Sequence, residues 1–419
     1  MRLAITFQRV DPSKGGAETY VADLLRCLVA SGHQVSLFAN EWDASSLPDD
    51  IECVQVEAAG LTRSRRIWDF AKNSETALKS RSFDCVIGFI NTWHQDILIP
   101  QGGVHAASLE ANSRRFAPGW RRALYSAAKR LNPKWWWLYG AIEREQYDPS
   151  RKTRFVAVSR MVANDLRRFH CVPEDHVSVI PNAIDADRLR VGDRAGVRAR
   201  IRAEHGLADT DLVGLFVAHN FRLKGLPPLL EAMAARVRLD PSRRVIHLFV
   251  CGGGKIAPMR RIVERLGLSG AIQLIGFAPS VRDYYQAADF FVLPSYYDPC
   301  SLVVFEALAC GLPVITTACN GAGEVMAAGR EGFVISRPDD APAMIVALDA
   351  MADDPRRQAM SARAVELGRA QSFDRHVERL LELCSDVAAR KRSHRQDAKS
   401  PRRREEIRQV DQRANKIES

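Results

Sequence analysis

Two carboxylates lie eight positions apart in the stretch "SYYDPCSLVVFEALACG", residues 295–311. Asp298 stands just before a short apolar segment, and Glu306 lies inside it. The segment begins with Ser301, a residue typical of a helix N-cap, and continues from Leu302 in an apolar pattern that predicts a buried helix. A buried carboxylate is costly unless a partner hydrogen-bonds to it. Glu306 therefore predicts such a partner, which need not belong to the protein.

Two cations, Arg222 and Lys224, follow an apolar run in "DLVGLFVAHNFRLKG". This places them in a loop at the carboxyl end of a predicted strand, where ligands of open α/β sheets bind, and two cations suit a diphosphate. The alternative is a pair of solvated surface charges. Asp298 and Glu306 follow another predicted strand, and in a doubly wound sheet they converge on the same edge, which favours a shared site.

Two glycines, Gly15 and Gly16, lie between the first predicted strand and the first predicted helix in "DPSKGGAETYVADLL". Glycines let the backbone approach a ligand closely, and a helix N-terminus favours an anionic or hydroxyl-rich group. A plain strand-to-helix turn explains the same residues equally well.

The residue types together describe a site for a nucleotide-sugar, because the cations suit a diphosphate and the carboxylates suit sugar or ribose hydroxyls. No D-x-D triad follows a strand, and no His and Asp cluster has the spacing of metal ligands. We therefore expect no metal and no cofactor, with a UDP-sugar or another nucleoside-diphosphate sugar as the substrate.

The elements that must position these residues form two βαβ series. Short apolar runs alternate with longer helical patterns from "RLAITFQ" onward, and the alternation restarts at "DLVGLFVA", which predicts two Rossmann-like α/β domains. The predicted boundaries are residues 1–184 for the first domain, 185–372 for the second, 373–389 for a C-terminal helix and 390–419 for a basic, disordered or marginally helical tail.

The totals agree with a two-domain globular protein, since 419 residues is long for one core. No apolar run reaches the roughly 18 residues that span a bilayer, and the first apolar run is too short for a signal peptide. Nine single cysteines without a C-x-x-C pair favour reduced thiols in a cytoplasm. The net charge of +10 comes mostly from the tail, which has 11 Lys or Arg against 5 Asp or Glu.

The sequence resembles the retaining glycosyltransferases of family 4. The stretch "YYDPCSLVVFEALACGLPVITT" is similar to their E-x7-E signature, and "GGAET", "QGGVH", "IPNAID", "FRLKG" and "AADFFVLPS" follow in the order of that family. The resemblance implies the GT-B fold, with two Rossmann-like domains facing each other across a cleft. It also implies an acceptor-side N-terminal domain, a C-terminal domain that binds the nucleotide-sugar and a last helix that crosses back.

The resemblance further implies roles for individual residues. Glu306 would hold the ribose and Asp298 the hydroxyls of the donor sugar, while Arg222 and Lys224 would take the diphosphate. His105, in "QGGVHAAS", resembles the family histidine that contacts the transferred sugar near the scissile bond; a histidine that only fills a loop is the alternative.

Four further residues complete the predicted donor-binding set: Gly15, Gly16, Ser301 and Leu302. One departure from the family pattern stands at Asp298, where glutamate is usual and the shorter side chain reaches less far. Retention, as the family implies, would have the acceptor attack the sugar face from which the diphosphate departs, with the β-phosphate accepting the acceptor proton.

The acceptor should meet the N-terminal half, where residues 114–137 hold seven Lys or Arg, four tryptophans and no acid. This composition favours contact with an anionic membrane surface, as in a peripheral protein of the inner membrane. A basic helix on a solvated face with tryptophans in the core is the alternative. No nucleic-acid partner is expected, because the sequence offers no binding fold for one.

We therefore predict a cytoplasmic hexosyltransferase that moves a hexose such as glucose to a cell-surface glycan or glycolipid, with lipopolysaccharide core as the favoured acceptor. One rival is a nucleotide-sugar 2-epimerase of the same fold, which would act without an acceptor. The other is a non-catalytic sugar- or lipid-binding protein, against which Glu306, Lys224 and His105 together argue.

Overall fold

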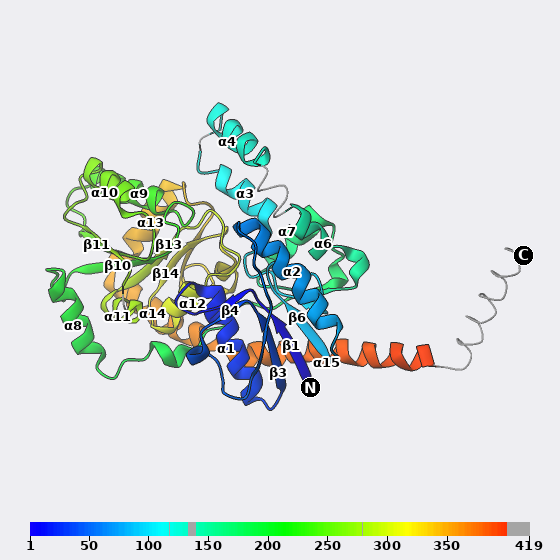
Figure 1. The fold of residues 1–419 in the computed structure, drawn as a ribbon. Helices are drawn as coiled ribbons and strands as arrows, with labels where there is room; N and C mark the ends of the chain where they lie inside the picture. Colours follow the sequence, from blue (N-terminus) through cyan, green and yellow to red (C-terminus); the bar gives the residue numbers. More distant parts are fainter. Residues whose placement is uncertain (117, 133–139, 279, 400–419) are drawn as a thin grey trace, which may run out of the picture.

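The computed structural model of the chain describes residues 1–116, 118–132, 140–278 and 280–399. It contains two α/β domains, each built on a fully parallel sheet (Figure 1). Cavities between the domains are lined by residues of both. The predicted fold class, two Rossmann-like domains facing each other across a cleft, is confirmed.

The N-terminal domain carries a seven-stranded sheet in the order β5-β3-β1-β6-β7-β8-β9. Its strands are β1 (Arg2–Thr6), β3 (Gln34–Ala39), β5 (Glu52–Gln55), β6 (Cys85–Gly88), β7 (Ile97–Leu98), β8 (Arg154–Ala157) and β9 (Val177–Val179), and a separate pair joins β2 (Arg9–Val10) to β4 (Glu41–Trp42). Its helices are α1 (Gly16–Ala30), α2 (Arg63–Lys79), α3 (His105–Ser113), α4 (Trp120–Arg130), α6 (Ala141–Gln146) and α7 (Arg160–His170). The strand order reverses beside β1, which makes the loop after β1 a switch point.

The C-terminal domain carries a six-stranded sheet in the order β12-β11-β10-β13-β14-β15. Its strands are β10 (Leu212–Val217), β11 (Ile246–Cys251), β12 (Ile272–Gly276), β13 (Phe290–Leu293), β14 (Val314–Thr317) and β15 (Gly332–Ile335). Its helices are α8 (Arg194–Glu204), α9 (Leu226–Leu239), α10 (Ile256–Arg265), α11 (Val281–Ala287), α12 (Leu302–Ala309), α13 (Ala341–Ala352) and α14 (Asp354–Ala370). The switch point here lies between β10 and β13.

The apolar runs of the sequence form the buried centre of this second sheet. All six residues of β10 are buried, as expected for a central strand covered by helices on both faces. Helix α9 packs against α10 and α13, whereas α12 packs against α14 and α11 against α8. Because crossovers are right-handed and their direction reverses at the switch point, α9 and α12 cover opposite faces of the sheet.

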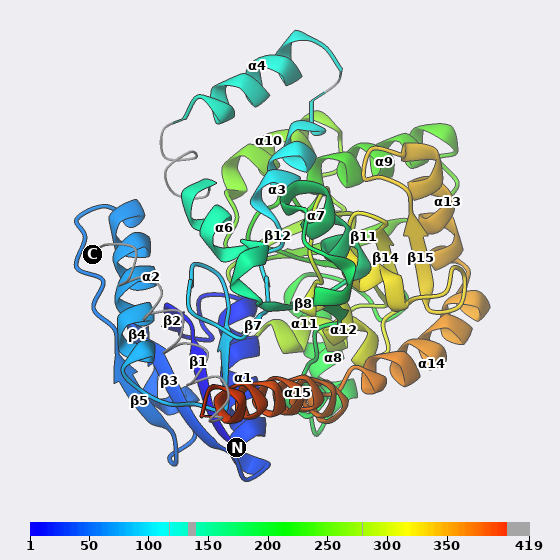
Figure 2. The same cartoon turned by 90° about the vertical axis from the view of Figure 1, so that its right-hand side faces the viewer.

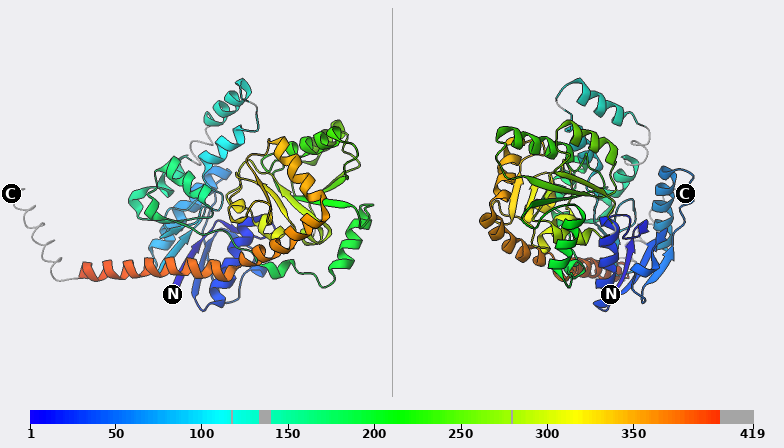
Figure 3. Two further views of the ribbon diagram at one scale, coloured as in Figure 1. Left: turned by 180° about the vertical axis from the view of Figure 1, so that it is seen from behind. Right: turned by 90° about the vertical axis from the view of Figure 1, so that its left-hand side faces the viewer.

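The last helix, α15 (Phe373–Lys399), leaves the C-terminal domain and returns along the N-terminal domain beside α1 (Figures 2 and 3). Ile184 and Ser372, the residues at the two predicted domain boundaries, form an isolated parallel bridge where the chain crosses and returns.

The predicted end of this helix at residue 389 is wrong. The chain has no glycine or proline between 389 and 399, and Lys391 Nζ lies 2.5 Å from Asp96 Oδ2 on the N-terminal domain. The predicted tail is therefore helical up to Lys399, and residues 400–419 lie outside the described part of the chain.

Helices α3 and α4 stand out from the body beside the opening between the domains (Figures 1 and 2). Helix α4 and the residues that join it to α3 carry the described part of the basic, tryptophan-rich segment, whereas Trp135, Trp136 and Trp137 lie outside the described residues. Within the described residues, no helix is both long and apolar enough to cross a lipid bilayer.

Candidate active site

Lys224 and Asp298, which the sequence predicted to share a sheet edge, form an ion pair at the switch point of the C-terminal sheet. The ammonium nitrogen of Lys224 lies 2.5 Å from Asp298 Oδ2 and 3.4 Å from the carbonyl oxygen of Tyr297. Both side chains are largely withdrawn from solvent. The shorter aspartate thus reaches the lysine directly and holds its charge at the carboxyl end of β10.

Glu306 has a partner within the protein. The hydroxyl of Tyr285 donates a hydrogen bond of 2.8 Å to Glu306 Oε2, from the neighbouring helix α11. Burial raises the pKa of Glu306, and the hydrogen bond from Tyr285 opposes that shift. Tyr285 is therefore the predicted hydrogen-bonding partner for one of the two carboxylate oxygens of Glu306.

Ser301 occupies the N-cap position of α12, as predicted, but its hydroxyl accepts no capping hydrogen bond. The amide of Ser301 instead points to Asn320 Oδ1 at 3.4 Å, and the same oxygen accepts from the amide of Ala322. The predicted N-cap position is confirmed, and the side chain of Asn320, from the loop after β14, holds the backbone amide at the start of α12.

Gly15 and Gly16 lie at the start of α1, against the start of α12 in the other domain. A Cβ atom added to Gly16 would lie 3.3 Å from Cδ1 of Leu302. The predicted donor-binding residues Gly16 and Leu302 are thus brought together across the domains. This close packing is a structural reason for a glycine at position 16, in addition to the predicted contact with a ligand.

His105 is the first residue of α3 and is paired with a buried glutamate. Its Nδ1 atom lies 2.6 Å from Glu143 Oε1, which also accepts a hydrogen bond of 3.0 Å from the His105 amide. Nε2 of His170 lies 3.3 Å from the other carboxylate oxygen. Burial alone would raise the pKa of Glu143, but its hydrogen bonds with His105 and its contact with His170 outweigh burial and lower the pKa to about 2.

The imidazole of His105 stands between two cavities. One, of about 160 Å³, lies within the N-terminal domain and is also lined by Glu143 and Gly103. The other, of about 270 Å³, lies between α3, α4 and Asn220 of the loop after β10. His105 therefore lies where the N-terminal domain meets the cavity between the domains.

Tyr297 joins the two halves of the site. Its hydroxyl accepts a hydrogen bond of 3.1 Å from the amide of Val104 and donates one of 2.9 Å to Asp165 Oδ2. Gly103 has a φ of +69°, and a Cβ atom there would collide with the same hydroxyl. The hydrogen bond from Val104 to Tyr297 therefore holds the neighbour of His105 against the neighbour of Asp298.

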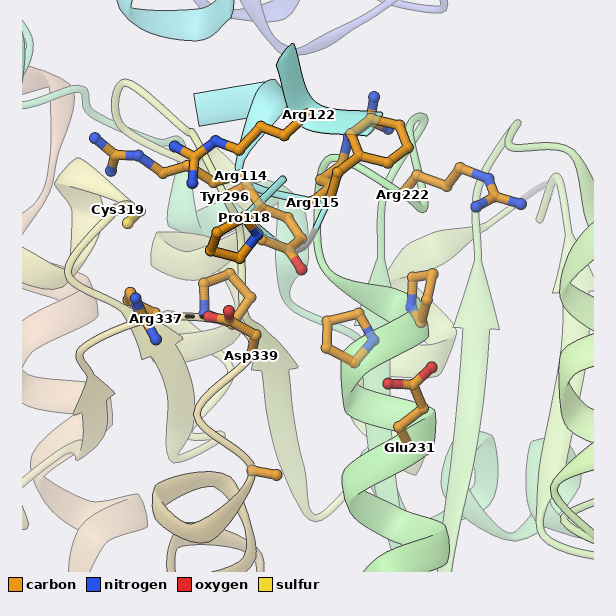
Figure 4. Close-up of a pocket in the computed structure, with 15 residues that line it drawn as sticks. Arg114, Arg115, Pro118, Arg122, Arg222, Glu231, Tyr296, Cys319, Arg337 and Asp339 are labelled. Carbon is orange, nitrogen blue, oxygen red and sulfur yellow. Dashed lines mark ion pairs between the residues drawn. The ribbon is translucent and has the colours of Figure 1, made fainter. Parts of the chain in front are cut away.

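Arg222, the second predicted diphosphate ligand, is exposed. It takes no part in the ion pair that Lys224 forms with Asp298. It lies on the wall of a larger cavity between the domains, whose labelled residues Figure 4 shows. Of the two cations, Lys224 is the one held at the sheet edge.

Sequence reasoning missed Glu143, Tyr297 and Asp165. Glu143 is 38 positions from His105, and no motif links the two. In the stretch "GAIEREQY", Glu143 is followed by three polar or charged residues, so no local signal marked it as buried. Tyr297 stood next to Asp298 in the stretch already singled out, but its partners come from the other domain.

Comparisons with known proteins agree with this geometry. The family described as "Glycosyltransferase Family 4" matches residues 14–188, and the family described as "Glycosyl transferases group 1" matches residues 197–367. The "Probable transglycosylase" of Burkholderia thailandensis is 31% identical over 391 residues, which cover 90% of this chain and 96% of that protein.

A second relative is the "Lipopolysaccharide glucosyltransferase WaaG" of Escherichia coli, 24% identical over 324 residues, or 77% of this chain and 82% of WaaG. A crystal structure of WaaG has a TM-score of 0.74 at 22% identity and covers 91% of this chain and 99% of its own. The crystal structure of Anabaena HepE in complex with UDP-glucose has a TM-score of 0.63 at 15% identity, and the match covers 94% of this chain and 100% of HepE. The two family matches in tandem, the full-length relative and the shared architecture show that the chain belongs to the family 4 glycosyltransferases of the GT-B fold.

Proposed function

We propose that the protein is a retaining glycosyltransferase that moves a hexose, such as glucose, from a nucleoside-diphosphate sugar to a cell-surface glycan or glycolipid. The observation that carries the proposal is the Lys224–Asp298 pair at the switch point, with Glu306 on the helix that follows. The name of WaaG supports glucose as the sugar and lipopolysaccharide core as the favoured acceptor, and the UDP-glucose bound to HepE supports a UDP-sugar donor.

The proposed reaction breaks the bond between C1 of the donor sugar and the diphosphate oxygen and forms a bond from C1 to the acceptor oxygen. Lys224 and Arg222 would stabilise the charge that develops on the leaving diphosphate. The acceptor attacks the face from which the diphosphate departs, and its proton passes to a β-phosphate oxygen. Glu306 would hold the ribose, and His105 would contact the transferred sugar.

The proposed reaction uses no metal and no cofactor. Positive charge from Lys224 and Arg222 takes the part that a divalent cation plays in other nucleotide-sugar enzymes. Activity should therefore survive dialysis against EDTA, and restoration of lost activity by Mg²⁺ or Mn²⁺ would overturn this part of the proposal.

Helix α4 supports a peripheral membrane contact on the cytoplasmic side of the inner membrane. Trp120, Leu124 and Leu131 are 70%, 60% and 79% exposed, and their spacing of four and seven places them on one side of the helix. An exposed apolar side with cations beside it suits an anionic bilayer, where aromatic rings settle at the headgroups.

A donor screen tests the proposed function. Thermal unfolding would be followed with UDP- and GDP-sugars, and a donor should raise the midpoint of the parent protein but not of Glu306→Gln. The stabilising donor is then incubated without acceptor, where epimerisation of its sugar would favour the rival 2-epimerase. If no nucleotide-sugar stabilises the parent, the proposed function is wrong.

A further inference from the structure

A cavity of about 870 Å³ opens between the domains beside the candidate donor site. Its wall carries two acids, Glu231 and Asp339, against the five arginines Arg114, Arg115, Arg122, Arg222 and Arg337. Figure 4 shows that the arginines come from both sides, three from the α3–α4 segment and two from the loops after β10 and β15. The cavity is therefore a strongly cationic space between the two domains.

Some of this charge is balanced within the protein. Arg114 pairs with Glu110 at 2.8 Å, and Arg337 pairs with Asp339 at 3.3 Å (Figure 4). Both arginines are well exposed, so these pairs hold their guanidinium groups only weakly.

Other charge is left unbalanced. Arg122 and Arg222 make no ion pair with a carboxylate among the residues that the structure describes. Guanidinium groups match the geometry of phosphate oxygens and bind them through two parallel hydrogen bonds. The free charge in the cavity thus fits a phosphate group better than a neutral sugar.

The cavity is distinct from the donor site, although the two adjoin. Of the predicted site residues, only Arg222 lines it. Its C-terminal wall is formed by α9 and the start of α13, which cover the face of the sheet opposite to α12 and Glu306. Two residues connect the cavity to the ion pair at the sheet edge. Arg222 lies two positions before Lys224, and Tyr296 lies two positions before Asp298.

Helix α4 has two sides with different characters. Arg122, Tyr125 and Lys129, spaced by three and four, lie on the side that lines the large cavity and the neighbouring one beside His105. The exposed apolar residues Trp120 and Leu124 lie on the other side. The inward cations are therefore placed beside the cleft, where they can meet a ligand.

We propose that this cavity binds a phosphate group carried by the acceptor, so that the acceptor is a phosphorylated saccharide. The inference rests on the proposed function and names the substrate class of the same site. The volume lies within the range of about 300 to 1,000 Å³ that is usual for small-molecule sites, which leaves room for a sugar together with its phosphate. Arg115 lines both this cavity and the one beside His105, so a saccharide whose phosphate is held here can extend toward His105.

Calorimetry on the full chain tests the inference with glucose 6-phosphate as the probe and glucose as its uncharged match. The protein is first saturated with the nucleoside diphosphate that the donor screen identifies, so that the donor site is filled. We expect glucose 6-phosphate to bind at least about tenfold more tightly than glucose, because only the phosphate forms charge-assisted hydrogen bonds. The double variant Arg122→Gln/Arg337→Gln should lose at least about tenfold in affinity for it.

Arg121→Gln is the matched control, since Arg121 lies on the same helix, is exposed and does not line the cavity; its affinity should stay within about twofold of the parent. Thermal unfolding shows that each variant is folded. The inference is overturned if glucose 6-phosphate fails to bind the parent, or if the double variant binds it as tightly as Arg121→Gln does. It is also overturned if the nucleoside diphosphate displaces glucose 6-phosphate, because the phosphate would then occupy the donor site. Absence of any nucleotide binding would instead reject the proposed function.

Discussion

The imidazole of His105 is held by the carboxylate of Glu143, with Nδ1 of the histidine 2.6 Å from Oε1 of the glutamate. The pKa of Glu143 is lowered to about 2, so the carboxylate stays ionised at any pH at which the enzyme works. A charged acceptor on Nδ1 fixes the orientation of the ring. Glu143 is thus a positioning residue for His105 at the junction of the two cavities.

Glu143→Gln should slow transfer by about tenfold, because a charge-assisted hydrogen bond is worth about 1.5 to 3 kcal/mol. Nucleoside diphosphate binding should change little, since Glu143 is not among the predicted donor ligands. Steady-state kinetics on the variant, on His105→Ala and on the double variant check this, and the two effects should not add. Glu145→Gln is the control, because that glutamate is exposed on the same helix; additive effects would contradict a shared role.

Glu306→Gln should weaken binding of the nucleoside diphosphate, because a neutral amide replaces a charge-assisted bond to the ribose worth roughly 1.5 to 3 kcal/mol. Calorimetry measures the loss. Tyr285→Phe removes only the protein's own hydrogen bond to Glu306 and should weaken binding less. If the nucleotide binds Glu306→Gln as tightly as the parent, Glu306 has a structural role with Tyr285 and no role in the donor site.

The topology explains why much of the site could be predicted from the sequence. Residues that follow parallel strands of one sheet meet at the carboxyl end of that sheet, so Lys224 and Asp298 could be placed together although 74 positions separate them. The start of α12 followed from its apolar pattern, since local signals set where a helix begins.

Contacts made by distant segments could not be predicted in the same way. Nothing in the sequence joins His105 to Glu143, and nothing in it shows that the amide of Ser301 meets the side chain of Asn320, from another loop. Past residue 389, α15 is accompanied by an ion pair of Lys391 with Asp96, which lies just before β7 in the N-terminal domain. Tertiary partners decided each of these features.

Lys224→Ala should lower turnover more than stability, since the proposed role of the lysine is to stabilise charge that develops as the diphosphate leaves. The variant leaves Asp298 without its partner, so some loss of stability is expected, and Lys224→Ala/Asp298→Asn separates the two effects. Turnover should stay low in the double variant while the unfolding midpoint recovers. A parental rate of transfer in Lys224→Ala would remove the lysine from the site.

The stability of the protein should fall as the pH drops from about 6.5 to about 4. Burial lowers the pKa of His376 to about 4, whereas the unfolded chain titrates near 6.5. The unfolded state then binds more protons than the native state in this range, so acid favours unfolding. A shift of this size corresponds to roughly 3 to 4 kcal/mol.

The two ring nitrogens of His376 contact the hydroxyl of Tyr20 at 2.5 Å and the carbonyl oxygen of Pro181 at 2.8 Å. These contacts join α15 to α1 and to the crossover segment, so a change at His376 tests this one titrating group. His376→Gln keeps a polar side chain without a titrating group. Chemical unfolding at pH 7 and pH 5 should show a smaller loss for the variant than for the parent. An equal loss in both proteins would assign the acid sensitivity to other groups.

The exposed side of α4 should bring the protein to anionic bilayers. Two forces would act there: burial of Trp120, Leu124 and Leu131 at the interface, largely insensitive to salt, and attraction of cations to the headgroups, screened over about 8 Å at physiological ionic strength. Co-sedimentation with vesicles that contain anionic lipid should show binding that falls as salt rises. The chain is ended at Lys399 for this measurement, so that the basic residues 400–419 do not contribute.

The two sides of α4 allow the forces to be separated. Replacing Trp120, Leu124 and Leu131 by serine should remove the binding that persists at high salt, whereas glutamine at Arg121, Arg122, Lys129 and Arg130 should remove the part that salt screens. Vesicles of neutral lipid should bind weakly in every case, since each cation near an anionic surface adds about 1 kcal/mol that a neutral surface lacks. If the chain ending at Lys399 does not bind anionic vesicles even at low salt, α4 is a solvated basic helix, or residues 400–419 supply the attraction. The membrane contact proposed for this segment is then wrong.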